Sequence, residues 1–239
     1  MKYTLNYIWI NSNNIHVNIN ECEYLNCIRK HHKYIYKNRE IDIKYWNWNS
    51  ILPLIKRYDY DLYILCTQIN PAHSTLLADI SRFIILYFNP GVYIDSDFIL
   101  TEWFDNFIEN IPDNIQFVSK GTHCGSKAMV SGLYTSVKHA EIIKLFLERV
   151  KTRLLAIKKR GQLYSVNLLN HIITTNLREL FTLGNVDREK NIYLEWPHEP
   201  HKQTPIKFED KHTPYVRYCL KLPKYTRWTR VTKETPIFL

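Results

Sequence analysis

The chain is predicted to fold as one α/β domain, with a mixed, mostly parallel sheet flanked by helices and an irregular C-terminal segment. Two observations predict this class. Strand-like and helix-like segments alternate along the first part of the chain, as in parallel sheets. Residues 72–100 read as a helix, a tight turn, a short strand and a pair of carboxylates. No linker or repeat marks a second domain in residues 1–239, so we expect a sheet core over about 1–135 and a largely helical region over about 136–239.

An amphipathic helix is predicted over residues 72–88. Its apolar residues recur at spacings of three and four, which places them on one stripe. Ser74 stands where a helix cap is expected. Asp79 and Arg82 are three residues apart and are therefore neighbours on the helix surface. The apolar stripe consists of Leu77, Ile80, Ile84 and Tyr87.

A turn and a short strand follow this helix. Residues 89–91, Asn-Pro-Gly, end the helix because proline cannot continue it and glycine tolerates the positive φ of a reversal. Residues 92–94 are typical of a buried strand, and Asp95 and Asp97 flank Ser96 at its C-terminal end. Open α/β sheets form their ligand crevice at such strand ends. Two carboxylates there can supply the oxygen ligands that Mg²⁺ or Mn²⁺ prefers.

The N-terminal part of the core is predicted from shorter signals. A second Asp-x-Asp triplet, residues 59–61, precedes an apolar run and is interpreted as a loop that enters a strand. The predicted elements are a first strand at 3–10, a loop at 11–20, a surface helix at 21–37, a second strand at 41–48 and a third, buried strand at 62–66.

Beyond the carboxylates the clearest signal is a helix over 143–157, which Gly161 ends. Lys144, Lys151 and Lys158 recur on another face of this helix. That row is expected to be solvated, with contact to lipid or acceptor phosphates as the alternative. The other predicted elements are a short helix at 103–108, strands at 115–118 and 128–134 and a helix at 163–180, with no long periodic run from residue 184 onward.

Composition limits the environment and the partners. The formal charge of +9 and the pI near 9.2 favour phosphorylated partners and anionic membrane surfaces, and a solvated basic surface explains them better than a dedicated nucleic-acid site. No nucleic-acid recognition module is visible, so no nucleic acid is expected. Five cysteines without paired spacing indicate a reducing compartment. With no signal peptide and no long apolar run, we expect a cytoplasmic protein, with peripheral membrane contact left open.

Residues 78–97, ADISRFIILYFNPGVYIDSD, resemble the donor-binding core of the DXD-containing GT-A glycosyltransferases. This group includes yeast α-mannosyltransferases, bacterial polysaccharide-synthesis enzymes and clostridial glucosylating toxins. One departure is Pro90, where the family usually has a first glycine. The matching positions are Asp79, Arg82, Gly91, Tyr93, Asp95 and Asp97.

The resemblance implies a GT-A, Rossmann-like fold and a metal-dependent hexosyltransferase, mostly of the retaining type. Its donor would be a UDP- or GDP-sugar carrying a hexose or N-acetylhexosamine, and its acceptor a glycan, lipid or protein. By this resemblance Asp97 would bind Mn²⁺ or Mg²⁺ directly, and Asp95 would bridge the metal, the ribose and the sugar. Arg82, held by Asp79, would meet the sugar or its phosphate.

Further donor contacts are implied at four positions. Tyr93 and Ser96 would lie beside the donor. Trp9, in LNYIWIN, would stack on the nucleotide base, although Asn11 and Ser12 replace the glycines that usually follow it. Trp228, in TRWTR, is the candidate for contact with the departing diphosphate. A Thr-Gly-Pro turn of related enzymes is represented here only by Thr174-Thr175-Asn176.

Several alternatives remain open at this point. His198 and His201, with His212 beyond, could bind zinc, but two prolines interrupt their spacing and no cysteine pair completes a site. Residues 46–49 could face the same crevice as Asp95 or could pack the sheet edge. The carboxylates could serve nucleotidyl or phosphoryl transfer, although no phosphate-binding Gly-rich loop is present. The chain could also be an inactive, basic binding protein with the same fold.

Overall fold

A computed structural model gives the structure of most of the sheet and its helices. It describes residues 4–10, 41–95, 98–100, 108–124, 127–161, 171–184, 186–196, 215–217 and 237–238. Among these residues, no helix has both the length and the apolar character that crossing a bilayer requires.

Within the described residues, eight strands form two sheets. The larger sheet contains β1 (Thr4–Ile8), β2 (Asp42–Trp46), β3 (Gly91–Ile94), β5 (Phe117–Cys124), β6 (Lys127–Thr135) and β7 (Asn191–Trp196). The smaller one pairs β4 (Phe98–Leu100) with β8 (Tyr215–Arg217). The helical elements are α2 (Trp48–Tyr58), α3 (Tyr60–Gln68), the 3-10 turn η2 (Pro71–His73), α4 (Ser74–Phe88), α6 (Glu141–Arg160), the π-helical turn η3 (His171–Thr175) and α8 (Asn176–Thr182).

The larger sheet is mixed and mostly parallel, as predicted. Its strand order is β2-β1-β3-β6-β5-β7. Strand β1 pairs in parallel with both β2 and β3, and β5 pairs in parallel with β7. Strand β6 is antiparallel to both of its neighbours, β3 and β5. The larger sheet therefore consists of a parallel half and a mixed half that meet at β3.

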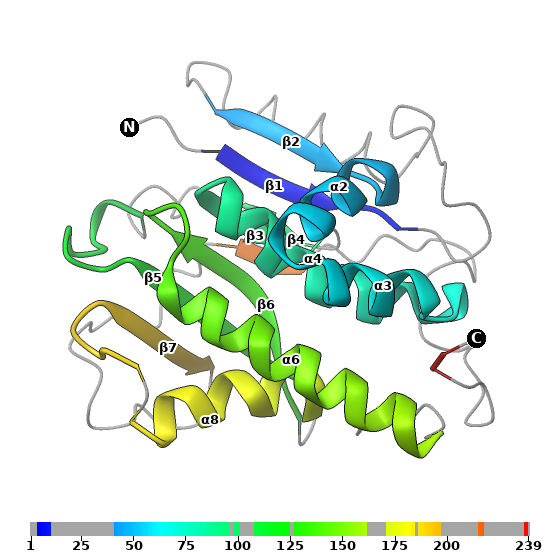
Figure 1. The fold of residues 1–239 in the computed structure, drawn as a ribbon. Helices are drawn as coiled ribbons and strands as arrows, with labels where there is room; N and C mark the ends of the chain where they lie inside the picture. The colour runs from blue at the N-terminus through cyan, green and yellow to red at the C-terminus, as the bar shows by residue number, and fades with distance from the viewer. Residues whose placement is uncertain are drawn as a thin grey trace.

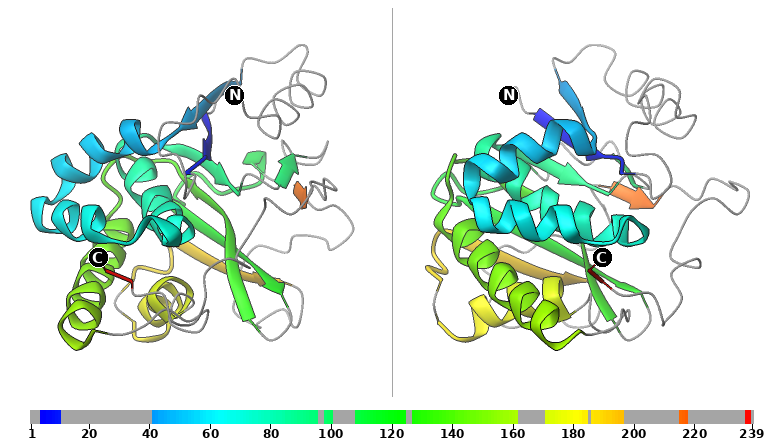
Figure 2. Two further views of the ribbon diagram at one scale, coloured as in Figure 1. Left: turned by 90° about the vertical axis from the view of Figure 1, so that its right-hand side faces the viewer. Right: turned by 45° about the vertical axis from the view of Figure 1, so that its right-hand side comes forward.

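The helices α2, α3, α4, α6 and α8 lie on one face of the sheet (Figures 1 and 2). The core sits between this helical layer and the sheet. Helix α4 is central, because its whole middle section is buried and Phe83 stacks on Phe146 of α6 with ring centroids 3.8 Å apart. The buried cluster extends to Ile237, whose carbonyl accepts a hydrogen bond from Asn70 N–H. Residues near the end of the chain thus complete the core beside the start of α4.

Most of the strong periodic signals are confirmed. The helix predicted over 72–88 corresponds to α4, the strand at 92–94 to β3, and the helix at 143–157 to α6. Gly161 ends α6 in the left-handed conformation. The strands predicted at 3–10, 41–48 and 128–134 match β1, β2 and β6. The predictions for 11–20, 21–37 and 103–107 fall outside the described residues.

The third predicted strand, at 62–66, is wrong. Those residues belong to helix α3, whose buried residues Leu62, Leu65 and Cys66 follow helical spacing. The preceding triplet is not a strand-entry loop, because the Asp59 carboxylate accepts a hydrogen bond from Leu62 N–H at 2.7 Å and caps this helix. A five-residue apolar run fits a strand or a buried helix turn equally well, and here the cap decides.

Other element boundaries also differ from prediction. Ser74 is the first residue of α4 and not its cap; His73 occupies the cap position, and its side chain does not cap the helix. Strand β2 stops at Trp46 because Asn47 forms a capping box with Ser50 and starts α2, a helix that the sequence reading missed. The predicted strand at 115–118 begins at Phe117 and runs to Cys124. Strand β7 lies in the segment judged to lack a periodic run.

The lysine row of α6 is only partly solvated. Lys151 forms an ion pair with Asp59 at 2.5 Å, and Lys158 donates a hydrogen bond to Gln68. These two lysines join α6 to both ends of α3. Lys144, one repeat earlier, is exposed. The prediction of a solvated row is therefore wrong at Lys151, whereas Lys144 and Lys158 are exposed.

Gly91 allows the chain to reverse from α4 into β3. Its φ is +145°, in a region that side chains rarely adopt, and a Cβ there would lie 2.4 Å from the carbonyl oxygen of Thr4. Strand β1 therefore approaches the start of β3 too closely for any side chain. This is the reversal that the Pro-Gly pair predicts.

We expect Gly91→Ala to destabilise the fold by about 2 to 5 kcal/mol, because it adds both backbone strain and a clash with β1. Gly161→Ala is the matched control: that glycine also has a positive φ, but nothing lies within 4 Å of the added carbon. The control should lose only about 1 kcal/mol. Urea unfolding of both variants measures the difference, and equal losses would contradict this account.

The Asp59–Lys151 pair should make stability depend on pH. Partial burial alone would raise the pKa of Asp59, but the hydrogen bonds from Lys151 and from Leu62 N–H outweigh it, so the pKa lies below its ordinary value. The stabilisation is complete above the pKa of the unfolded chain, about 4, and disappears as the pH falls through the lower folded value. Asp59→Asn keeps the cap and should lose about 1 kcal/mol at neutral pH.

The comparison is made by unfolding wild type and Asp59→Asn between neutral pH and acid. The difference between them should shrink as the pH falls below the unfolded pKa. Lys144→Gln removes an exposed lysine from α6, the helix that carries Lys151, and serves as the control. A constant difference across the range would show that the ion pair does not carry the effect.

Candidate functional site

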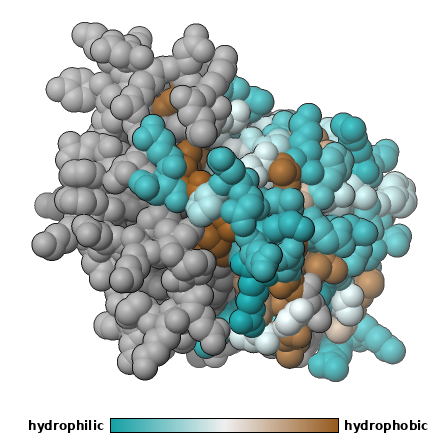
Figure 3. Space-filling view, turned by 90° about the vertical axis from the view of Figure 1, so that its left-hand side faces the viewer, coloured by the Kyte–Doolittle hydropathy of each residue, from teal (hydrophilic) through white to brown (hydrophobic). Residues whose placement is uncertain are grey.

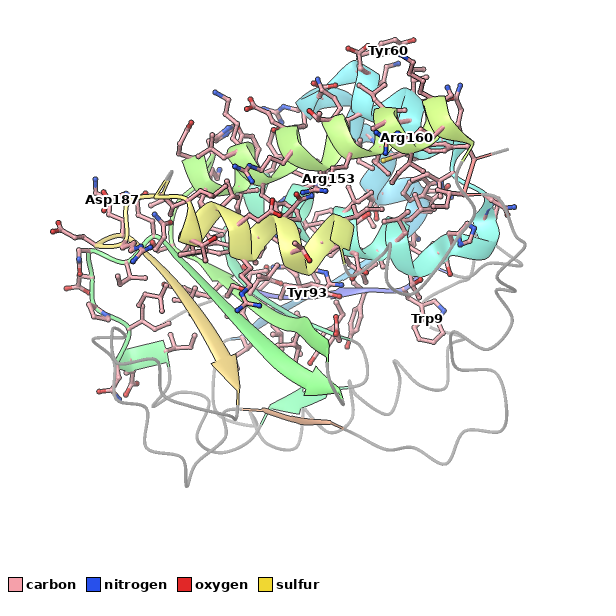
Figure 4. The ribbon with its side chains drawn as sticks, turned by 90° about the horizontal axis from the view of Figure 1, so that it is seen from below. Trp9, Tyr60, Tyr93, Arg153, Arg160 and Asp187 are labelled. Atoms are coloured by element: carbon pink, nitrogen blue, oxygen red, sulfur yellow. The ribbon has the colours of Figure 1, made fainter. Side chains whose placement is uncertain are left out.

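The candidate site lies at the edge of the sheet where parallel strands β1, β2 and β3 end. Tyr93 is aligned with Asn6, and Ile8 with Trp46, so Asp95 lies at the level where β1 and β2 also stop. Trp9 follows directly and donates its backbone N–H to the carbonyl of Trp46 at 2.9 Å. Figure 4 shows the Trp9 side chain beyond the end of β1, toward the same end of the molecule. The predicted position of Asp95 at a strand-end edge is thus observed.

Four of the predicted site residues meet at this edge. Arg82 of α4 pairs through Nη2 with Asp79, one helical turn away, and through Nη1 with Oδ1 of Asp95 at 3.3 Å. The Tyr93 hydroxyl donates to the same Asp95 oxygen at 2.9 Å. The Arg82 guanidinium carbon lies 5.1 Å from the centroid of the Tyr93 ring. These residues, Asp79, Arg82, Tyr93 and Asp95, are called the Arg82 cluster below.

Burial within the Arg82 cluster increases toward the arginine. The side chain of Arg82 is 6% exposed, that of Asp79 14% and that of Asp95 26%. A guanidinium buried to this extent requires charged partners, and the planar donor fork of arginine can serve two carboxylates at once. One positive and two negative charges leave the cluster with an excess negative charge, and Asp95 is its most exposed member.

Asn6 is a structural residue of this edge that the sequence reading missed. Its side chain is fully buried, donates to the carbonyl of Val92 at 3.1 Å, and accepts from the indole N–H of Trp46 at 2.9 Å. One amide therefore links β1 to both of its neighbours and fixes the level of Asp95. The available signal was an asparagine inside the apolar segment TLNYI, since buried amides need partners.

Of residues 46–49, Trp46 and Trp48 pack, as the packing alternative predicts, and Asn47 caps a helix. Trp46 lies against the core with its indole bound to Asn6, and Trp48 is buried. Asn47 caps α2. None of these three contacts is directed at Asp95.

Asn176, in the stretch compared with the family's Thr-Gly-Pro turn, has a structural role. It is fully buried, accepts from Arg153 Nε at 2.5 Å and donates to the carbonyl of Ile172 at 2.6 Å. The amide thus ties α8 and the π-helical turn to α6. Cys66 is also buried, and burial raises the pKa of its thiol to about 12, which disfavours the reactive thiolate form.

Several predicted site residues lie outside the described part of the chain. These are Ser96, Asp97, Trp228, His198, His201 and His212. Within the described ranges, no group of three or more His, Cys, Asp or Glu side chains could hold a metal ion. The metal and zinc predictions therefore stay predictions.

Comparisons with known proteins find likeness in structure alone. No protein-family model and no curated protein sequence matches this chain. The structure titled PaToxG glycosyltransferase shares 15% identity with a TM-score of 0.43, covering 76% of this chain and 69% of that one. The ligand-free glycosyltransferase domain from the YGT toxin shares 10% identity with a TM-score of 0.36, covering 68% of this chain and 45% of that one.

A third structure, a transferase variant with two cysteines replaced by serine, shares 15% identity with a TM-score of 0.38. It covers 90% of this chain and 92% of the other. Two of these three similar structures carry glycosyltransferase in their titles. At these scores, any assignment of function rests on the residues of the site.

Two substitutions in the Arg82 cluster should lower the free energy of unfolding by unequal amounts. Tyr93→Phe removes one hydrogen bond to a charged oxygen and should cost about 1.5 to 3 kcal/mol. Arg82→Met leaves two carboxylates without their shared cation and should cost about 3 to 5 kcal/mol. Denaturant unfolding at neutral pH gives both values. If Arg82→Met were no worse than Tyr93→Phe, the ion pairs would not hold α4 to β3.

Proposed function

We propose that this protein is a metal-dependent glycosyltransferase. It moves a hexose or N-acetylhexosamine from a nucleoside diphosphate sugar to a glycan, lipid or protein acceptor. The observation that carries the proposal is the Arg82 cluster, which lies where parallel strands end. Its member Asp95 precedes Asp97 by two residues in the chain. Such an edge is where open α/β sheets bind nucleotides.

A divalent metal fits the chemistry of this site. Asp95 offers a hard carboxylate donor whose Oδ1 accepts hydrogen bonds from Tyr93 and Arg82, and its side chain is partly exposed. Asp97 would add a second carboxylate, and oxygen donors of this kind suit Mn²⁺ and Mg²⁺. When bound, such a metal supplies Lewis-acid neutralisation of the leaving diphosphate. The excess negative charge of the Arg82 cluster favours a cation at this position.

The chain's own residues supply orientation. Tyr93 and Arg82 hold the Asp95 carboxylate in one rotamer, which lowers the conformational cost of binding. Asp79 holds Arg82, and both acids would accept hydrogen bonds from sugar hydroxyls. Trp9, beyond the end of β1, would offer an aromatic face to the nucleotide base. Retention of configuration is part of the proposal and calls for no carboxylate base opposite the donor.

The test is a thermal-shift and hydrolysis screen of UDP- and GDP-sugars with and without Mn²⁺. We expect one donor to raise the melting temperature only when metal is present, and to be hydrolysed slowly. Asp97→Ala should abolish both effects. Asp61→Ala is the matched control, because it removes the last carboxylate of the other Asp-x-Asp triplet, which lies exposed on α3.

The alternatives give different results when nucleoside triphosphates are added to the screen. An inactive binding protein would show donor stabilisation without hydrolysis. A nucleotidyl or phosphoryl transferase would consume a nucleoside triphosphate in place of a nucleotide sugar. If no nucleotide sugar stabilises the wild type, or if Asp61→Ala behaves like Asp97→Ala, the proposal is wrong.

A further inference from the structure

The outer face of the helical layer carries an excess of basic side chains. On α2, α3, α6 and the turn before α6, seven basic residues are exposed against three acidic ones, Asp61, Glu141 and Glu148. Asp59 and Lys151 neutralise each other. The exposed basic residues are Lys56, Arg57, Lys138, Lys144, Lys158, Lys159 and Arg160. This surface is called the basic helical face.

Contacts between neighbouring helices make the basic helical face continuous. At one end, Arg57 lies over the Phe88 ring at 5.0 Å, and Phe88 contacts the His139 ring next to Lys138. The Tyr58 hydroxyl then reaches the backbone of Lys144. Further along α6, the Lys151–Asp59 pair and the Lys158–Gln68 hydrogen bond hold α3 alongside. The charges therefore lie on one surface that spans the length of α6.

Large apolar side chains are exposed on the same surface. Tyr60 of α3 is 60% exposed and Leu155 of α6 is 49% exposed. Leu155 follows Lys151 by one helical turn and Tyr60 follows Asp59, so each stands next to one partner of the Lys151–Asp59 ion pair. Figure 4 shows Tyr60 and Arg160 on the helical side of the molecule, with Tyr93 and Trp9 toward the sheet. In Figure 3, hydrophilic side chains dominate the described surface and apolar ones lie among them.

We propose that the basic helical face docks on an anionic lipid bilayer. Positive charges gain attraction from anionic headgroups, and an exposed tyrosine and leucine among them can enter the interfacial region. Tyrosine is favoured at that depth because its ring is apolar and its hydroxyl is polar. A nucleic acid would use the charges but would gain nothing from Leu155. The pairing of charge with apolar exposure thus favours lipid.

This docking goes beyond the proposed catalytic function and does not depend on it. The face belongs to the helical layer (Figure 1), whereas the Arg82 cluster lies at the strand-end edge of the sheet. Docking would therefore leave that edge beside the bilayer and not covered by it. An acceptor held at the membrane surface would then be within reach of the site.

The test is co-sedimentation of the full chain with vesicles of phosphatidylcholine alone or with about one-third phosphatidylserine. We expect binding only to the anionic vesicles, weakening as added salt shortens the Debye length from about 10 to about 3 Å. Lys159→Gln/Arg160→Gln should weaken binding about 25-fold, since each basic residue near the surface contributes roughly fivefold. Tyr60→Ser/Leu155→Ser should weaken it at every salt concentration.

Matched controls come from the loop between α8 and β7, at the other end of the molecule (Figure 4). Arg188→Gln/Lys190→Gln removes the same charge, and Leu183→Ser removes an exposed leucine. Both should bind anionic vesicles nearly as well as wild type. The inference is overturned if wild type ignores anionic vesicles or if the controls lose as much binding. It also fails if duplex DNA binds as tightly as vesicles while Tyr60→Ser/Leu155→Ser changes nothing.

Discussion

The structure depends on one buried arginine held between two carboxylates. Arg82 joins helix α4 to the end of strand β3, and Tyr93 supports it from the strand. Helix α4 is the centre of the helical layer and β3 is the point where the parallel and mixed halves of the sheet meet. A displacement of this contact would therefore move both layers, and it would move Asp95 at the candidate site.

Polar side chains hold the surrounding elements in place through a few buried or half-buried contacts. Asn6 connects three strands, and Asn176 connects α8 to α6. Asp59 caps α3 and also connects this helix to α6. Each of these side chains makes at least two hydrogen bonds, and at least one of them reaches a residue that is distant in the sequence. Because a buried polar group without partners is costly, each contact favours one arrangement of its elements over the alternatives.

The molecule separates two kinds of surface. The strand-end edge carries acidic side chains around one arginine, whereas the outer helical face carries an excess of basic ones. The net charge of +9 is thus not spread evenly over the described surface. A cation-binding edge and an anion-binding face can coexist in this way because charges on different sides of a domain are largely screened from each other.

The sequence by itself determined the unit from α4 to Asp95 and the helix α6, because their signals are local: helical periodicity, a Pro-Gly turn and a β-branched strand followed by carboxylates. It also indicated that Asp79, Arg82 and Asp95 belong together. Only the tertiary structure decided that residues 62–66 are helical, that residues 191–196 form an edge strand, and that Asn6 and Lys151 have distant partners. Short apolar runs fit either secondary structure, and hydrogen bonds across the fold become visible only when the segments are brought together.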